Sequence, residues 1–206
     1  MKNPIILFTF CTLIITTACQ KEEESFTQIS GQVYEFNNGA PVPFAKVRFE
    51  WWNPATFGET RHFVDSTTAD AQGNYSLSGD VPNGEEYYVI ADAPGYFITE
   101  ETEVIRPNVK RGQKQTVNLD LIPYAWVRMN IRKTGIYNTL EINPPPGSNS
   151  VTGFVAWSDT ILHTRVLGNR NIELIVFKNH SFGNYDIVKY PLQSIGHDTV
   201  DISIEF

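Results

Sequence analysis

The residue types that could carry chemistry are scattered along this sequence. The four histidines, His62, His163, His180 and His197, form no short spacing such as His-x-His or His-x3-His, which a zinc site would favour. A Gly-x-Ser-x-Gly nucleophile elbow and a glycine-rich phosphate loop are both absent from the sequence. We therefore expect no metal, no cofactor and no catalytic activity.

Two acidic patterns need an explanation. Glu100, Glu101 and Glu103 could serve acid–base chemistry or bind a cation, but a solvated strand or loop edge is the favoured interpretation. Asp70 and Gly73 are spaced as in part of a calcium loop. A hairpin turn explains them fully, because Asp caps such a turn and Gly adopts positive φ.

Aromatic residues are the strongest candidates for a ligand site. Trp51 and Trp52 are neighbours in a strand pattern, so their side chains point to opposite faces. Because Trp51 is in phase with Phe49, we expect Trp51 to face the core and Trp52 to be exposed. With Phe57 and His62, Trp52 could then stack on a sugar ring or anchor a protein partner. Alternatively, the loop insertion after Trp52 folds back over it, or Trp52 packs against a second domain.

The N-terminal segment is typical of an exported protein. Lys2 precedes an apolar run over residues 5–15, which is too short to cross a bilayer core of ~30 Å as a helix. Thr17 and Ala18 then lead into Cys19. This pattern resembles a bacterial lipoprotein signal peptide, although the preceding Thr16 departs from the usual aliphatic residue.

The resemblance implies that residues 1–18 are removed and that Cys19 is acylated, so that lipid at Cys19 holds the protein on the membrane. Several acyl chains would give stable anchoring. The alternative is an ordinary secretory signal with no lipid. Residues 19–26 form an acidic tether, and Lys21 followed by three glutamates resembles the signal that exports lipoproteins to the cell surface in one group of Gram-negative bacteria. We expect an outer-membrane lipoprotein at the cell surface; a plain solvated spacer is the alternative.

Charge and cysteine usage exclude some functions. The chain of 206 residues has a formal net charge of −7, and residues 124–206 carry equal numbers of acidic and basic groups. An acidic chain with no basic patch argues against nucleic-acid binding. Cys11 would leave with the signal, so the mature protein has no internal disulfide.

Residues 27–122 are dominated by hydrophobic residues with a period of two, which predicts β-strands. Four sequence blocks follow one another along this segment: Gly31-x-Val33, Pro41-Val42-Pro43-Phe44-Ala45-x-Val47, Thr68-x-Asp70-x-x-Gly73-x-Tyr75, and Tyr87-x-Val89-x-Ala91-x-x-x-Gly95-Tyr96. In these blocks the segment resembles the carboxypeptidase regulatory-like domain. The resemblance implies a seven-stranded, prealbumin-like β-sandwich that is usually non-catalytic, despite the family's name.

Residues 123–206 predict a second antiparallel β-sandwich, immunoglobulin-like in its strand spacing. Strand-like runs recur near every ten residues, with turns at Gly168-Asn169 and Gly183-Asn184. Trp126 lies on the polar-phase face near the domain boundary, where we expect it to contact the first domain. The fold class is therefore all-β, with two sandwiches in tandem.

The sequence favours a non-catalytic, lipid-anchored envelope protein that acts as a structural or protein-binding module. The alternative is a glycan-binding accessory lipoprotein of a polysaccharide-uptake system, with Trp52, Phe57 and His62 as the ligand-contact residues. The partner would accordingly be an envelope protein or a glycan. The sequence does not identify the ligand, the oligomeric state or the angle between the domains.

Overall fold

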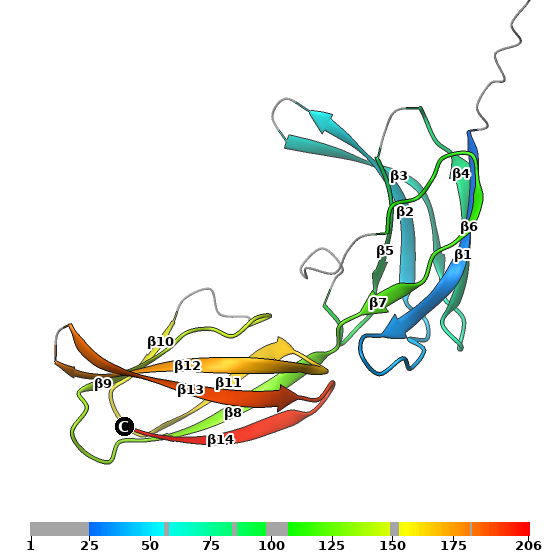
Figure 1. Ribbon diagram of the computed structural model, residues 1–206. Helices are drawn as coiled ribbons and strands as arrows, with labels where there is room; N and C mark the ends of the chain where they lie inside the picture. Colours follow the sequence, from blue (N-terminus) through cyan, green and yellow to red (C-terminus); the bar gives the residue numbers. More distant parts are fainter. Residues whose placement is uncertain (1–24, 56–57, 84–85, 98–106, 149–152, 182) are drawn as a thin grey trace, which may run out of the picture.

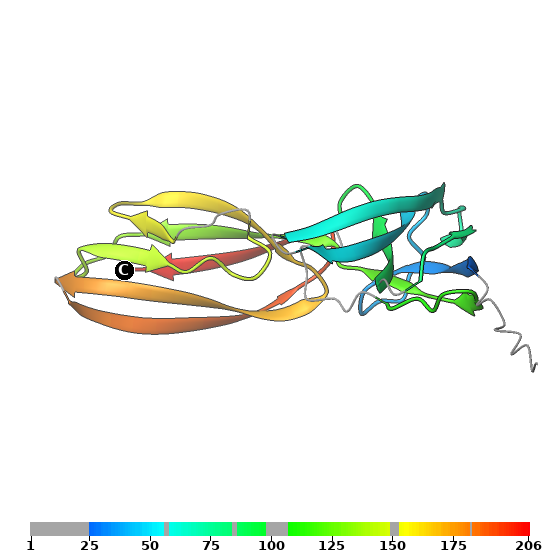
Figure 2. The ribbon, with the colours of Figure 1, turned by 90° about the horizontal axis from the view of Figure 1, so that it is seen from above.

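The computed structural model describes residues 25–55, 58–83, 86–97, 107–148, 153–181 and 183–206. Within these ranges the chain forms two β-sandwiches joined end to end and no helix, which confirms the predicted all-β fold. The molecule is bent where the sandwiches meet (Figure 1), and from above they lie one after the other (Figure 2). No helix suited to crossing a membrane is found among the described residues.

The first sandwich contains seven strands. They are β1 (Phe26–Glu35), β2 (Lys46–Ala55), β3 (Gly58–Thr68), β4 (Asn74–Asp80), β5 (Glu86–Asp92), β6 (Lys114–Thr116) and β7 (Leu119–Leu121). One sheet has the order β4-β1-β6, with β7 also pairing β1, and the other has the order β3-β2-β5. Strands β6 and β7 pair β1 in parallel, whereas the other pairs are antiparallel.

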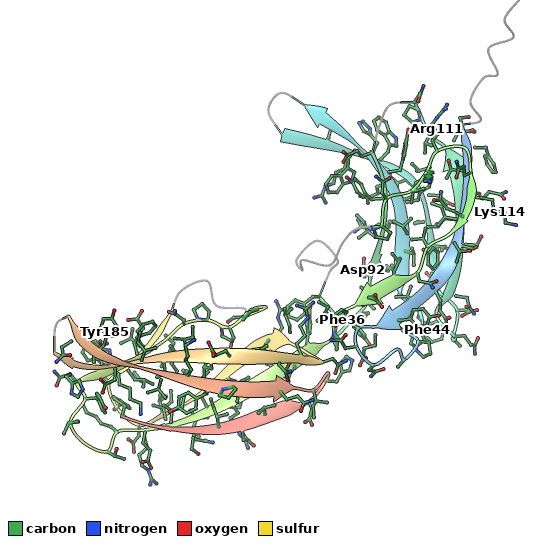
Figure 3. The ribbon with its side chains drawn as sticks, in the orientation of Figure 1. Phe36, Phe44, Asp92, Arg111, Lys114 and Tyr185 are labelled. Atoms are coloured by element: carbon green, nitrogen blue, oxygen red, sulfur yellow. The ribbon has the colours of Figure 1, made fainter. Side chains whose placement is uncertain are left out.

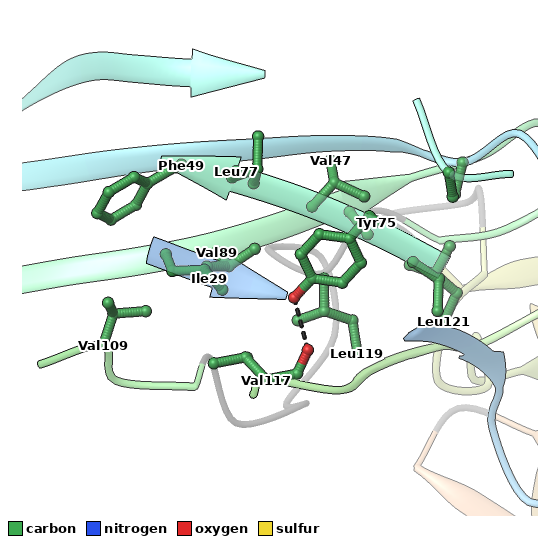
Figure 4. Packing of buried hydrophobic residues seen from close by; sticks show 14 of the residues in the cluster. Ile29, Val47, Phe49, Tyr75, Leu77, Val89, Val109, Val117, Leu119 and Leu121 are labelled. Atoms are coloured by element: carbon green, nitrogen blue, oxygen red, sulfur yellow. Dashed lines mark hydrogen bonds between the residues drawn. The ribbon is translucent and has the colours of Figure 1, made fainter. Parts of the chain in front are cut away.

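The core of the first sandwich fills the space between these sheets (Figure 4). Val47 and Phe49, which alternate with polar residues along β2, are fully buried, and so is Val89 of β5. Tyr75 is buried too, and its hydroxyl donates a 2.6 Å hydrogen bond to the carbonyl of Val117. This bond satisfies the one polar atom of a ring that otherwise packs as a hydrophobic group, while burial raises the pKa of Tyr75.

The second sandwich also contains seven strands. They are β8 (Tyr124–Arg132), β9 (Thr139–Ile142), β10 (Phe154–Ala156), β11 (Thr160–Leu167), β12 (Arg170–Ser181), β13 (Asn184–Ser194) and β14 (Thr199–Glu205). They form a sheet of order β10-β9-β12-β13 and a facing sheet of order β11-β8-β14. A four-stranded and a three-stranded sheet facing each other are the layers of an immunoglobulin-like sandwich.

Alternation decides which side chains of the second sandwich are buried. Along β8, Val127, Met129 and Ile131 are buried while the residues between them face solvent. Strand β14 lies parallel to β8 and places Ile204, followed by Phe206, in the same core. Phe206 therefore helps to close this core.

The sandwiches are joined with almost no linker. Only Ile122 and Pro123 separate β7 from β8, and the bridge between Tyr96 and Pro123 keeps this crossing extended. Ile122 is itself fully buried. A connection of two residues, one of them a proline with fixed φ, leaves little freedom for rotation between the sandwiches.

Candidate functional site at the junction of the sandwiches

The predicted exposed tryptophan is covered. Trp52 does lie on the face of β2 opposite Phe49, but it is only 5% exposed, so the predicted exposure was wrong. Tyr88 of β5 packs against the indole with ring centroids 4.8 Å apart, and the guanidinium of Arg61 from β3 lies 4.4 Å above it. Neighbouring strands of its own sheet thus bury the ring, and because Arg61 lies in the insertion after Trp52, the alternative in which that insertion covers the indole is favoured.

The other predicted contact residues do not complete a platform with Trp52. His62 pairs with Trp51 across the β2–β3 ladder and stacks on it, with ring centroids 3.8 Å apart and an interplanar angle of 13°. The stack lies on the core side, where Trp51 packs against the first core as predicted. Trp52 and His62 are therefore on opposite faces of the sheet. Phe57, the lipidation candidate Cys19 and the glutamates of residues 100–103 lie outside the described residues.

The densest polar contacts between distant parts of the chain occur where the two sandwiches meet, which we call the junction. Backbone hydrogen bonds connect the two sandwiches there: the amide of Gly168 donates to the carbonyl of Pro123 at 2.8 Å, and that of Tyr124 donates to the carbonyl of Gly95 at 2.8 Å. The amide of His197 donates to the carbonyl of Tyr124 at 2.7 Å. The loops of both sandwiches are thereby tied to the crossing strand.

A buried carboxylate lies at the centre of the junction. Glu35, at the end of β1, is 7% exposed and accepts hydrogen bonds from both sandwiches. Asn169 donates to Oε1 at 2.9 Å, Tyr96 donates to Oε2 at 2.8 Å, and a ring nitrogen of His197 lies 3.2 Å from Oε2. Asn38 also donates to Oε1 at 2.6 Å. A buried charge is costly unless it is satisfied in this way.

The hydrogen bonds set the charge state of Glu35. Burial by itself would raise the pKa of its carboxyl, but the bonds from Asn169, Tyr96 and His197 more than offset this effect and place the pKa below its ordinary value. Burial and the bond to the carboxylate raise the pKa of Tyr96. At neutral pH, Glu35 is therefore an anion that accepts bonds from a neutral phenol and an amide.

The second sandwich presents its two junction side chains from strained turns. Asn169, between β11 and β12, has φ of 54°, and His197, before β14, has φ of 62°. Left-handed backbone is uncommon for residues other than glycine, with asparagine and histidine among those that tolerate it best. The amide of Asn169 is fully used: besides Glu35, its nitrogen donates to the carbonyl of Phe36 at 3.0 Å, and its oxygen accepts from the amide of Gly196 at 2.8 Å.

An apolar cluster and two arginines complete the junction. Phe97, Ile122 and Leu167 are buried together, with Phe36 and Tyr124 packed against them. Phe36 lies where the two sandwiches meet (Figure 3).

Both arginines come from the second sandwich. The guanidinium of Arg165 lies 4.8 Å from the ring of Phe97, and that of Arg170 lies 4.6 Å from the ring of Phe36. Trp126, expected to contact the first sandwich, is outside this cluster and 39% exposed.

This arrangement positions the two sandwiches relative to each other. Glu35 is enclosed by donors from both sandwiches, and no group of three or more metal-ligating side chains occurs in the part of the chain that the structure describes. Sequence reasoning missed Glu35, Asn169 and His197 as a set. Asn169 was placed in a turn, which was correct, but nothing in local spacing relates it to a residue 134 positions away.

Comparison with known protein families agrees with the family resemblance predicted for the first half of the chain. The sequence profile of the carboxypeptidase regulatory-like domain matches residues 28–122, which confirms the resemblance for that part of the chain. No curated protein sequence matches the chain.

Structural comparison also matches several solved structures, each with a TM-score below 0.5. The minor pilin GBS52 of Streptococcus agalactiae has 11% identity and a TM-score of 0.44, covering 87% of this chain and 94% of that one. The shaft pilin SpaA of Lactobacillus rhamnosus GG has 8% identity and a TM-score of 0.36, with coverage of 87% and 97%. The TIE protein of Bacillus anthracis has 12% identity and a TM-score of 0.37; 87% of this chain is covered, but only 34% of that protein.

Proposed function

We propose that this chain is a non-catalytic, lipid-anchored protein of the outer membrane, exposed at the cell surface, which holds its second sandwich at a fixed angle to contact a partner protein. The observation that carries the structural role is the bonding of Glu35 to Asn169 and His197 across the junction. A carboxylate shared by two bodies, next to a two-residue crossing, makes a stiff spacer rather than a pair of freely jointed domains.

Sequence supports the anchor. The apolar run over residues 5–15 and the small residues before Cys19 fit a lipoprotein signal, and Cys19 would be the only thiol of the mature chain. The acidic residues after Cys19 would keep the first sandwich away from the bilayer surface as an extended, solvated tether. Strand β1 begins at Phe26, so only a few residues of sequence separate it from Cys19.

Two measurements in intact cells test the proposal. Growth with an alkyne analogue of palmitate should label the wild-type protein and leave Cys19→Ser unlabelled. Protease added to intact cells should cleave the protein, while a periplasmic protein in the same cells stays whole. Equal labelling of both forms would refute the lipid anchor, and cleavage only after lysis would refute exposure at the surface.

The alternative glycan-binding function stays a prediction. Its leading residue, Trp52, is covered by Tyr88 and Arg61, so a sugar ring could reach the indole only if these side chains moved. The protein-binding role is therefore preferred.

A further inference from the structure

Two neighbouring hollows beside the junction share Arg170 and Asn171 in their walls. The first, of about 490 Å³, is lined by Phe36, Asn37, Asn169, Arg170, Asn171 and Gln193, and so draws on both sandwiches. The second, of about 390 Å³, continues onto the second sandwich. We call the two together the junction groove.

The charge at the centre of the junction groove is unmatched. The guanidinium carbon of Arg170 lies 4.6 Å from the ring centroid of Phe36, and within the described residues the guanidinium has no ion pair or hydrogen bond. Its Nε is buried without a partner. Elsewhere on this sandwich the cation of Lys189 is paired with Glu173 at 2.8 Å, and that of Arg128 is paired with Asp201.

An arginine held in this way is prepared for a carboxylate. Its planar fork can donate two parallel hydrogen bonds to one carboxyl group, a geometry that lysine cannot provide. Stacking on Phe36 restricts the side chain before any ligand arrives, so less conformational entropy is lost on binding.

The two hollows on either side of Arg170 have walls of different polarity. In the first, Asn171 and Gln193 are exposed, and a side-chain amide can both donate to and accept from a peptide backbone, whereas the amide of Asn37 already donates to the carbonyl of Asn169 at 3.0 Å. In the second, the wall is largely apolar, with Pro144–Pro146, Leu167 and Ile175 around it. Such a wall suits an aliphatic side chain.

We propose that the junction groove binds an extended segment of a partner protein that places a carboxylate on Arg170 and an aliphatic side chain against Pro144–Pro146 and Ile175. This inference rests on the protein-binding role proposed above and gives the partner its chemistry. The second sandwich has balanced charge, Glu173 in the groove is paired with Lys189, and the carboxylate of Glu35 at the junction is enclosed by its own hydrogen-bond donors. The fixed junction keeps both walls of the groove in register.

Peptide titration tests the groove directly. The probes are acetyl-Ala-Glu-Leu-Ala-amide, the same peptide with Gln in place of Glu, and trigalacturonic acid as a carboxylate on a sugar. Each is added to the isotope-labelled full chain in detergent micelles, and amide resonances are followed by NMR. We expect the Glu peptide to shift the resonances of Asn171, Ile175 and Gln193, and the Gln peptide to bind at least about tenfold more weakly, because a charge-assisted bond is lost.

Three variants separate the groove from general electrostatics. Arg170→Gln removes the fork, and the isosteric Asn171→Asp places a competing carboxylate beside it; each should weaken the Glu peptide about tenfold or more. Arg132→Gln, an exposed arginine lining a different hollow on the opposite sheet, is the matched control and should leave binding unchanged. The spectra of the variants also report whether the fold is kept.

Several outcomes would overturn the inference. These are equal binding of the Glu and Gln peptides, equal weakening by Arg132→Gln, shifts with trigalacturonic acid alone, and no shift up to about 10 mM peptide. Labelling at Cys19 and protease shaving do not depend on this result. A failed titration would therefore remove the groove while leaving the anchored, surface-exposed module standing.

Discussion

The β2–β3 hairpin and the junction both gather aromatic and charged side chains of the first sandwich, but they use them differently. At the hairpin, Trp52 is covered by Tyr88 and Arg61, which are neighbours in its own sheet. At the junction, Glu35 is satisfied by Asn169 and His197, which are 134 and 162 positions away along the chain. The hairpin contacts stabilise one sandwich, whereas the junction contacts define how two sandwiches are placed.

The comparison also shows where a ligand site can form. At the hairpin, the ladder brings Tyr88 and Arg61 over the indole of Trp52, while Phe63 of the same hairpin is 64% exposed. The junction leaves one cation, Arg170, with no anion of the described chain to pair with. The binding group that we propose for this protein thus lies where the two bodies meet.

The largest expected effect is at the hairpin. Trp52→Ala should lower the free energy of unfolding of the first sandwich by about 3 kcal/mol, because a buried indole and its contacts with Tyr88 and Arg61 are lost. Urea denaturation followed by circular dichroism measures this. Trp157→Ala, which removes a 69% exposed indole from the second sandwich, should cost less than about 0.5 kcal/mol. Equal costs for the two would mean that Trp52 is not buried.

The next largest effect is expected for Glu35→Leu, which tests whether the junction fixes the angle between the sandwiches. Glu35→Leu leaves Asn169, Tyr96 and His197 without their acceptor, and should cost about 2 kcal/mol and broaden the distribution of angles between the sandwiches in small-angle X-ray scattering. Its control is Glu50→Leu. Glu50 is 6% exposed but pairs with Arg48 inside the first sandwich, at 3.3 Å. A change of scattering with Glu50→Leu equal to that with Glu35→Leu would contradict the role of the junction.

Protonation of Glu35 at acidic pH should weaken its hydrogen bonds at the junction, with a smaller effect than Glu35→Leu. Because the pKa of Glu35 is lowered in the folded state, its contribution to stability is fully present above the ordinary glutamate pKa of about 4.3 and is lost as the pH falls through the lower folded value. Between pH 7 and pH 3, the distribution of angles between the sandwiches, derived from small-angle scattering, should broaden only at the acidic end. In Glu35→Leu the same titration should give a smaller change, and an equal change would assign the effect to other carboxylates.

The smallest expected effect is at the stacked pair on the core side of the hairpin. His62→Ala removes a ring that stacks on Trp51 at 3.8 Å, and should cost about 1 kcal/mol in the first sandwich. His62→Phe keeps an aromatic ring and should recover most of that loss. Urea denaturation again provides the measurement, and a cost as large as that of Trp52→Ala would mean that the stack, not the indole of Trp52, holds the hairpin together.

Much of the fold could be read from the sequence because strand burial follows a period of two. The alternation along β8 placed Val127, Met129 and Ile131 in the core, and the turn at Gly168-Asn169 was found from its residue types. The face of Trp52 was also correct. Its exposure was not, because alternation says which side of a sheet a residue takes and not what else packs on that side.

The sequence alone determined the all-β class, the regulatory-like first unit and the location of the turns, since these follow from local pattern and from short blocks of residues. Only the tertiary structure decided that Trp52 is covered, that Glu35 joins two sandwiches and that Arg170 lies on Phe36 without an anion. Those three facts depend on contacts between strands far apart in the chain. Neither a residue type nor a spacing records such contacts, because the free energy that fixes them comes from packing and hydrogen bonding after the sheets have formed.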